Sequence, residues 1–386
     1  MLNFNYCNPT KIIFGKDTIK NLGSNLKLFN IKNVLLLYGQ GSIFKNGVYN
    51  EAVNSLKDNN INFVELSGVK PNPRLSKVKE GIKVIKENAL QGIIAIGGGS
   101  VIDSAKAISA GSCYEGDVWE LFEKKGTIKK ALPIFTILTI SATGSEMNSG
   151  GVITNEAEGK KWAFGSPLLY PKISILDPSI QSSLPNIQTA NGCADAISHV
   201  LELYLDGTKN TDILDEISLG IIKTLIKHTK ILLKDSHNYD SRCEFVWSAT
   251  LALNGINGTG RVGDWASHQI EHSLSVLNDI SHGSGLSIIM PAWMEYLKQN
   301  CLDKLVKLGE NVFDIKDGTD IERANKAILA LKDFYKEIGL PTSLRDANVK
   351  KEDLSFIAEN ASMLSPLGSL KKLYKDDIYN ILNISY

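Results

Sequence analysis

The sequence predicts an α/β N-terminal domain built on a parallel sheet, followed by an all-α C-terminal domain. At 386 residues the chain exceeds the roughly 250–300 residues over which a single hydrophobic core grows, so two domains are expected. Short β-type runs alternate with helical segments in the first half, whereas β-type runs largely disappear after residue 185. This change of pattern is the basis of the predicted architecture.

The β-type runs of the first half read as buried parallel strands. Three of them, VLLLY, GIIAI and IFTIL, are apolar throughout, as expected for strands that are covered on both faces of a sheet. The predicted strands are residues 11–14, 34–38, 62–66, 92–96, 134–139 and 173–176.

The second half carries apolar residues at helical spacing. The breakers Asp177-Pro178 and Leu184-Pro185 place the boundary near residue 185, so the expected domains are 1–185 and 186–386. The clearest predicted helices are 187–205, 213–233, 241–255 and 264–277.

Composition excludes several classes of partner. Lys+Arg and Asp+Glu balance at 42 each, so no net field favours nucleic acid or an anionic membrane. The five cysteines include no C-x-x-C pair, which fits a reducing compartment. The N-terminal MLNFNYCNPTK lacks the features of a signal peptide, and no apolar stretch approaches the roughly 20 residues of a membrane span. We expect a soluble cytoplasmic protein.

One aspartate and four histidines form a metal-ligand pattern. Asp195 and His199 are four residues apart on one predicted helix, as are His268 and His272 on another, and His282 follows ten residues later. Residues four apart on a helix project from the same face, with Cβ atoms about 6 Å apart, so each pair can grip one ion. Oxygen and imidazole ligands without thiolate suit Fe²⁺, Zn²⁺ or Mn²⁺.

Each histidine taken singly is more often a satisfied buried group or a solvated one than a ligand. The clustering of four of the six histidines with a helical aspartate favours the metal, while His228 and His237 stand apart and read as surface residues. Five candidates are more than a site with an open position needs, so one of them serves as a proton relay or a supporting group in this interpretation.

Gly-rich turns suggest a nucleotide. The turn 97–100 (GGGS) follows an apolar strand and opens a predicted helix, where backbone N–H groups can approach a pyrophosphate closely. It matches neither G-x-G-x-x-G nor a Walker A sequence, so a plain tight turn is an equal alternative. Another turn, 139–146, contains four hydroxyl groups. They could bind phosphate, ribose or nicotinamide, or serve as ordinary helix caps.

The turn 39–42 (GQGS) bears on coenzyme preference. It contains no carboxylate to pair with a ribose 2′-hydroxyl, and Ser42 with Lys45 would favour a 2′-phosphate, hence NADP(H). The alternatives are a loop with a solvated lysine, or a missing acid supplied by Glu65 at the end of the next strand.

Nine stretches together resemble the iron-containing (group III) alcohol dehydrogenase family, and within it the NADPH-dependent butanol dehydrogenase and aldehyde reductase branch. Each stretch is weak alone, but they occur in the right order over residues 8–291. They are NPTKIIFG (8–15), YGQGSIFKNG (38–47), PNP (71–73), GGGSVIDSAKAI (97–108), SATGSEMN (141–148), LDP (176–178), NGCADAISHVLE (191–202), GDWASHQIEH (263–272) and SHGSGLSIIMP (281–291).

The resemblance implies a Rossmann-like dinucleotide-binding domain and a helical metal-binding domain, the dehydroquinate synthase-like architecture, usually in a homodimer. It implies hydride transfer between NAD(P)H and a small aliphatic aldehyde or primary alcohol, with one divalent metal, Fe²⁺ before Zn²⁺. By matched position, His272 and Asp264 would be catalytic, and the metal ligands would be Asp195, His199, His268 and His282.

The resemblance also implies a set of coenzyme contacts. Gly39 stands where NAD-preferring relatives carry aspartate, which favours NADP(H), although Gln40 departs from the glycine typical of the branch. Residues 300–386 match no motif and read as amphipathic helices. The implied contacts are Gly39, Gly41, Ser42, Asn72, Gly97, Gly98, Gly99, Ser100, Asp103, Thr139, Ser141, Thr143, Asn148 and Lys161.

Three alternatives stay open at this point. A glycerol dehydrogenase-like polyol oxidoreductase would keep the fold and change the substrate, although GDWASHQIEH favours the butanol dehydrogenase branch. A metal-dependent phosphate-ester hydrolase would use the glycine turn to hold phosphate. A non-catalytic nucleotide-binding sensor would bind metal without turnover.

Overall fold

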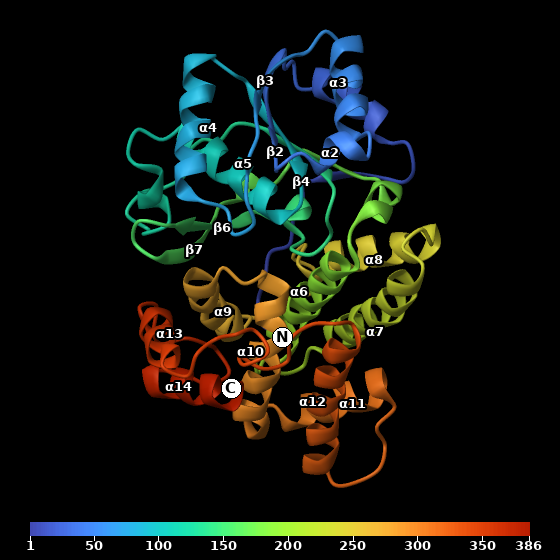
Figure 1. Cartoon of the computed structure of the whole chain (residues 1–386), viewed down its shortest axis with the longest axis vertical. Coiled ribbons are helices and arrows are strands. Elements are labelled where there is room, and N and C mark those ends of the chain that lie inside the picture. Colours follow the sequence, from blue (N-terminus) through green and yellow to red (C-terminus); the bar gives the residue numbers. More distant parts are fainter. The chain divides into compact units, whose positions relative to one another are not determined.

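Six parallel strands form the main sheet of the N-terminal half (Figure 1), in the order β1-β8-β5-β4-β2-β3. The computed structural model describes residues 1–386. All six predicted strands form, which confirms the α/β class of this half. They are β1 (Lys11–Phe14), β2 (Asn33–Tyr38), β3 (Asn62–Leu66), β4 (Gly92–Gly97), β5 (Ile134–Leu138) and β8 (Ile173–Leu176).

Alternate residues of the central strands enter two separate apolar clusters, one on each face of the sheet. Leu35 of β2 and Ile93 of β4 pack with apolar residues of α4 (Leu75–Glu87) and α5 (Gly99–Ser112). Their neighbours in sequence pack with α1 (Leu22–Lys27) and α3 (Val48–Asp58). Since both faces are covered, these strands carry apolar residues without polar alternation.

The α/β unit contains further elements that the sequence pattern did not reveal. An antiparallel hairpin joins β6 (Gly150–Asn155) to β7 (Lys160–Gly165). The short helices are α2 (Ser42–Lys45) and the 3-10 turns η1 (Ile19–Asn21), η2 (Val118–Leu121), η3 (Ser145–Met147), η4 (Pro167–Leu169) and η5 (Pro178–Ser183).

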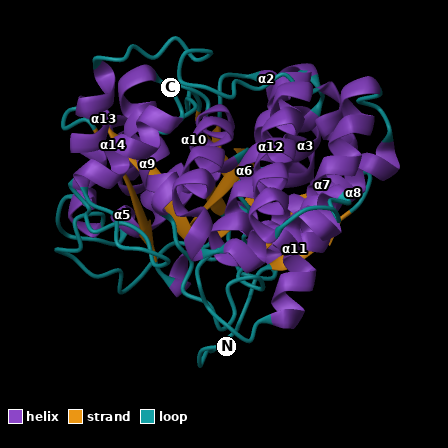
Figure 2. Ribbon diagram, turned by 90° about the horizontal axis from the view of Figure 1, so that it is seen from below, coloured by secondary structure: helices purple, strands orange, loops and turns teal.

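The second unit is helical (Figure 2), as predicted. Residues 300–386, expected only to be amphipathic helices, form four of them. The elements are α6 (Asn186–Tyr204), α7 (Asp212–Lys234), α8 (Tyr239–Ala252), α9 (Ala266–Asn278), α10 (His282–Leu297), η6 (Lys298–Asn300), α11 (Leu302–Phe313), α12 (Asp320–Glu337), α13 (Asp353–Ser362) and α14 (Lys375–Ile384).

Two short segments belong to a different unit from their neighbours in sequence. The α/β unit comprises Cys7–Leu184 with Ser236–Val246, and all other residues belong to the helical unit. Met1–Tyr6 lies in the helical unit, where the Leu2 N–H donates to the Gly260 carbonyl at 2.9 Å. The expected domain ranges 1–185 and 186–386 stay a prediction.

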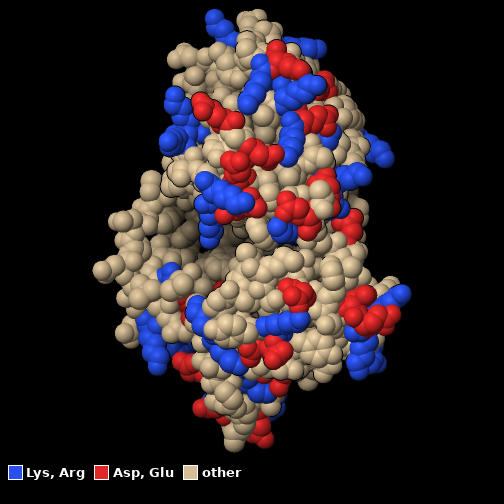
Figure 3. Space-filling view, turned by 90° about the vertical axis from the view of Figure 1, so that its left-hand side faces the viewer, with Lys and Arg blue, Asp and Glu red and all other residues tan.

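The surface carries charged residues of both signs (Figure 3), as the equal numbers of basic and acidic residues predict. Figure 3 shows Lys and Arg interspersed with Asp and Glu over the face in view. No helix of the chain combines the length and apolarity that crossing a membrane requires.

Helix α6 is the centre of the helical unit. Every residue from Thr189 to Tyr204 is buried, so its polar side chains must find partners inside the protein. Helix α10 meets it at backbone distance, because a Cβ added to Gly283 would lie 2.1 Å from the Asn191 carbonyl oxygen. A glycine at this position lets the start of α10 approach α6.

We expect Gly283→Ala to lower the free energy of unfolding by about 1–3 kcal/mol, because α10 must move away from α6. Gly220→Ala is the matched control: Gly220 lies on exposed α7 surface with no atom within 4 Å of an added Cβ, and alanine should stabilise it by about 0.5–1 kcal/mol. Denaturant titration measures both values. Equal stability of the two variants would contradict this packing argument.

Candidate metal centre and coenzyme-binding turns

Three imidazole nitrogens surround one carboxylate oxygen in the helical unit. Asp195 Oδ1 lies 3.5 Å from His199 Nε2, one turn later on α6. It lies 3.9 Å from His268 Nε2 on α9 and 3.6 Å from His282 Nε2 at the start of α10. The three helices thus bring together the four residues that the sequence proposed as a metal-binding set.

Three of these four residues are buried and His282 is partly exposed, and their chemistry suits a cation. Asp195 is only 3 % exposed, and His199 and His268 are 5 % exposed. Burial, with the neighbouring histidines as a smaller cause, holds the pKa of His199 well below its usual value, so this imidazole is neutral and its lone pairs can bind metal. His268 Nε2 is buried without a hydrogen bond. One oxygen and three imidazole nitrogens fit Fe²⁺ or Zn²⁺.

His272 lies at the edge of the cluster. It follows His268 by one turn of α9, and its ring centroid is 5.5 Å from that of His282. Unlike His268 it is partly exposed. The remaining histidines lie elsewhere, His228 on α7 and His237 on the segment that follows it.

Backbone N–H groups hold the Asp264 carboxylate, whose expected catalytic role stays a prediction. Its Oδ2 accepts hydrogen bonds from the backbone N–H groups of Ser369 and Leu370, at 2.7 and 2.9 Å, and Oδ1 accepts from Ala266 at 3.2 Å. Burial raises its pKa to about 6. These bonds tie the loop before α14 to the start of α9, which is an anchoring task.

Sequence reasoning overlooked two fully buried glutamates behind the histidines, Glu202 on α6 and Glu271 on α9. Each follows a proposed ligand by three residues, His199 and His268 respectively. A charged residue on the buried face of an apolar helix is the signal that could have identified them.

In the α/β unit, the GGGS turn lies at the carboxyl end of β4. The Thr139 N–H donates to the Gly97 carbonyl at 3.0 Å, so the ends of β4 and β5 adjoin. A Cβ on Gly99 would lie 2.4 Å from Thr143 Cγ2, so only glycine fits between the start of α5 and the turn after β5. Gly98 caps α5 without a side chain, which leaves N–H groups of its first turn for an anion.

A buried network holds the turn after β5 in place. Lys106 Nζ on α5 donates to Ser145 Oγ, Asn148 Oδ1 and the Gly150 carbonyl at 2.8, 2.9 and 2.6 Å. Asp103 Oδ1 accepts from Ser145 Oγ at 2.6 Å, and its Oδ2 accepts from the Val152 N–H at 2.9 Å. Lys106 is fully buried, and burial lowers its pKa to about 8.

This network changes the interpretation of two expected coenzyme contacts. The Asp103 and Asn148 side chains form hydrogen bonds with other protein groups, and these bonds shape the turn 141–148. Lys106, which had no assigned task, links them. Ser141 is likewise engaged, since its hydroxyl accepts from Gln181 Nε2 at 2.9 Å.

Asn72 and Lys161 come together from distant parts of the sequence. Lys161 Nζ on β7 donates to Asn72 Oδ1 at 3.0 Å, and both side chains are buried. The hairpin that the sequence did not predict therefore places one expected coenzyme contact beside another.

The turn after β2 contains no acid, and Ser42 and Lys45 are exposed there. The alternative acid, Glu65, accepts hydrogen bonds from Tyr38 and Tyr49, both at 2.6 Å. The bond to Glu65 is the main cause that raises the pKa of Tyr49 to about 12. Both carboxylate oxygens thus hold a protonated tyrosine.

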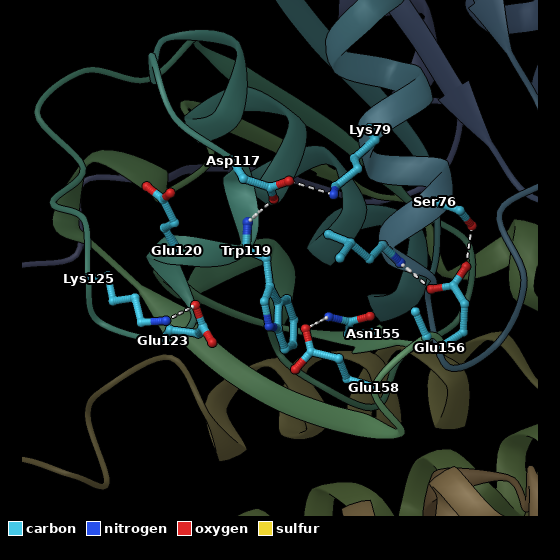
Figure 4. A pocket seen from close by; sticks show the side chains of 12 residues that line it. Ser76, Lys79, Asp117, Trp119, Glu120, Glu123, Lys125, Asn155, Glu156 and Glu158 are labelled. Carbon is cyan, nitrogen blue, oxygen red and sulfur yellow. Dashed lines mark hydrogen bonds and ion pairs between the residues drawn. The ribbon is translucent and has the colours of Figure 1, made fainter.

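A groove of about 530 Å³ lies on the α/β unit, and Figure 4 shows the side chains that line it. Its charged side chains pair locally, as Lys79 does with Asp117 at 2.6 Å and Lys125 with Glu123 at 2.9 Å. No expected site residue lines it. The groove is therefore not the coenzyme or metal site.

Comparison with known proteins identifies the family. Residues 9–178 match the iron-containing alcohol dehydrogenase family, and residues 189–386 match the Fe-containing alcohol dehydrogenase family, C-terminal. The chain belongs to the iron-containing alcohol dehydrogenase family. As a member, it is a nicotinamide-dependent oxidoreductase with an iron-type metal, which removes the hydrolase and sensor interpretations.

Individual relatives cover all or most of this alcohol dehydrogenase. It is 42 % identical to NADH-dependent butanol dehydrogenase A of Clostridium acetobutylicum over 100 % of both chains. It is 37 % identical to the NADPH-dependent aldehyde reductase YqhD of Escherichia coli, over 90 % of this chain and 89 % of that one. The crystal structure of NADH-dependent butanol dehydrogenase A from Thermotoga maritima superimposes with a TM-score of 0.97 and 47 % identity, covering 100 % and 99 %.

We expect Lys106→Met to lower the free energy of unfolding by about 3–5 kcal/mol, because buried acceptors around Asp103 lose their cation. Coenzyme binding, followed by fluorescence, should weaken as the turn 141–148 loosens. Lys79→Met is the control: that exposed ion pair contributes at most about 1 kcal/mol. If the two variants unfold at the same denaturant concentration, Lys106 does not hold the turn.

Proposed function

We propose that the enzyme is butanol dehydrogenase-like, and that it transfers hydride between a nicotinamide coenzyme and a small aliphatic aldehyde or primary alcohol. The observation that carries the proposal is the convergence of three histidine Nε2 atoms on Asp195 Oδ1, within 3.5–3.9 Å. Full-length relatives at 42 % identity are named butanol dehydrogenases, which supports this substrate class. A relative named 1,3-propanediol dehydrogenase is only 28 % identical, so a polyol is a weaker choice.

The proposed metal ligands are Asp195, His199, His268 and His282, with Fe²⁺ as the preferred ion and Zn²⁺ as the substitute. When bound, the divalent ion supplies Lewis acidity at the substrate oxygen, and the nicotinamide supplies or receives hydride. The protein residues provide the rest: a buried site that excludes water around the developing charge.

His272 is the proposed proton-transfer residue. It is partly exposed at the edge of the cluster, beside His282, and an imidazole exchanges protons near neutral pH. Since Asp264 is held by three backbone N–H groups, we give it no part in proton transfer.

We propose that residues 1–185 form the dinucleotide-binding domain and residues 186–386 the metal-binding domain. We also propose a homodimer, which analytical ultracentrifugation would detect. Backbone N–H groups of the GGGS turn would hold the pyrophosphate. The other parts of the coenzyme would contact Gly39, Gly41, Ser42, Asn72, Thr139, Thr143 and Lys161. The shape of the turn 141–148 would depend on Ser141, Asp103 and Asn148.

NADP(H) is the proposed preference over NAD(H). The turn after β2 lacks a carboxylate, and the nearby Glu65 holds two tyrosine hydroxyls. Relatives are named for NADH and for NADPH, so the names support either coenzyme.

The direct test is an anaerobic assay of metal-depleted protein reloaded with Fe²⁺ or Zn²⁺. Reduction of butanal with consumption of NADPH or NADH is expected only after reloading. Glycerol oxidation faster than butanol oxidation would reassign the substrate class, and absence of turnover on any alcohol or aldehyde would end the proposal.

We expect Asp195→Ala and His268→Ala to lose bound metal and turnover together, because each removes a ligand atom. His272→Ala should keep stoichiometric metal while turnover falls about 10²–10⁴-fold, the usual contribution of a proton-transfer group. Metal analysis beside steady-state kinetics measures both. Full metal content in the first two variants, or lost metal in the third, would reject the assignment.

We expect Gly39→Asp to raise the NADH/NADPH ratio of kcat/KM about tenfold or more, since a carboxylate accepts from a 2′-hydroxyl and repels a 2′-phosphate. An added Cβ meets only the Val69 carbonyl oxygen, at 3.5 Å, so the side chain fits. Gly39→Asn, equal in shape but uncharged, is the control. An equal ratio in the two variants would mean that charge at this turn does not set preference.

A further inference from the structure

Two buried carboxylates stand directly behind the histidines of the proposed metal site. Glu202 and Glu271 are both 0 % exposed, and glutamate is almost never fully buried unless its charge has partners. In both cases one partner is the Nδ1 atom of a histidine whose Nε2 faces Asp195. The same arrangement therefore occurs twice in one site.

Glu202 makes four contacts at the start of α9, and two of them are with His268. Its Oε1 lies 3.0 Å from His268 Nδ1 and also accepts from the His268 backbone N–H at 3.1 Å. The same oxygen accepts from the Ser267 hydroxyl at 2.5 Å, and Oε2 accepts from the Trp265 N–H at 2.6 Å. Because a carboxylate only accepts, His268 Nδ1 carries the proton, and its Nε2 presents a lone pair to the cluster.

Glu271 holds His282 across the gap between α9 and α10. Its Oε2 contacts His282 Nδ1, and its Oε1 accepts from the Ser275 hydroxyl on the same helix. Helix α10 passes close by, since a Cβ on Gly285 would lie 2.6 Å from Glu271 Cγ. The contact fixes the ring of His282 at the first residue of α10.

We propose that Glu202 and Glu271 are positioning residues of the metal centre. Each fixes the tautomer and ring direction of one histidine, so that its Nε2 points at the ion, and each adds a buried negative charge that favours a divalent cation. The inference rests on the proposed ligand set. His199 Nδ1, by contrast, makes no hydrogen bond, so His199 lacks such support and the two glutamates carry the orientation of the other imidazoles.

The test is the metal affinity of Glu202→Gln and Glu271→Gln, measured on the full chain by chelator competition with Co²⁺ and Zn²⁺ in the absence of substrate. Glutamine keeps the size and one oxygen acceptor but removes the charge. We expect each dissociation constant to rise about 10–100-fold, as for carboxylates that support metal-binding histidines elsewhere. The visible spectrum of the Co²⁺ form should change as well, since it reports ligand geometry.

Asp206→Asn is the matched control. Asp206 is also buried in the helical unit and accepts four hydrogen bonds, from the Thr208 N–H and hydroxyl and from the N–H groups of Val262 and Gly263, but none from a histidine. It should lose stability with unchanged metal affinity and an unchanged Co²⁺ spectrum. The melting temperature of each metal-free variant separates loss of folding from loss of affinity.

Metal affinities of both glutamine variants equal to that of Asp206→Asn would overturn the inference while leaving the ligand set intact. If Glu202→Gln fails to fold because α9 loses its first contacts, Glu271→Gln alone decides. Wild-type affinity in His268→Ala would instead refute the proposed ligand set, which distinguishes the two failures.

Discussion

Burial of the Asp195 carboxylate among three imidazoles is the constraint on which the helical unit depends. Asp195 Oδ1 has three histidine Nε2 atoms within 3.9 Å, and a buried carboxylate is stabilised by a nearby cation. The wholly buried face of α6, the start of α9 and the start of α10 must meet to build this arrangement, and Gly283 lets α10 approach α6 closely enough. The same packing of three helices therefore builds the helical unit and the proposed metal site.

In the proposed function the α/β unit has the opposite electrostatic role, since its glycine turn would bind the anionic pyrophosphate. Its sheet is covered on both faces, which leaves the carboxyl ends of β4 and β5 as the edge at which the glycine turn could bind a ligand. Close approach of Gly99 to Thr143 and the buried ammonium of Lys106 fix the shape of that edge. A family of enzymes that joins nicotinamide and metal needs both environments in one chain.

The sequence predicted the six strands of the main sheet, the helical character of the second half and the proximity of Asp195 to three histidines. Each of these depends on local periodicity or on spacing along one helix. It did not predict the hairpin β6–β7, which places Lys161 beside Asn72, nor the exact start of α9, where Trp265 adopts a left-handed φ of 67°. Sequence analysis did not identify Glu202, Glu271 and Lys106, because a charged residue on a helix usually faces solvent. Only the contacts between elements show that these three side chains are buried. Asp264 was expected to be catalytic, yet three backbone N–H groups hold it.

The central claim is that one ion sits among Asp195, His199, His268 and His282. Anomalous diffraction at the iron edge, from crystals of anaerobically Fe²⁺-loaded protein, tests it most directly. The account predicts a single peak within about 2.0–2.2 Å of one carboxylate oxygen and three imidazole nitrogens. A peak elsewhere in the chain, or these four side chains directed away from a common centre in the loaded crystal, would contradict it.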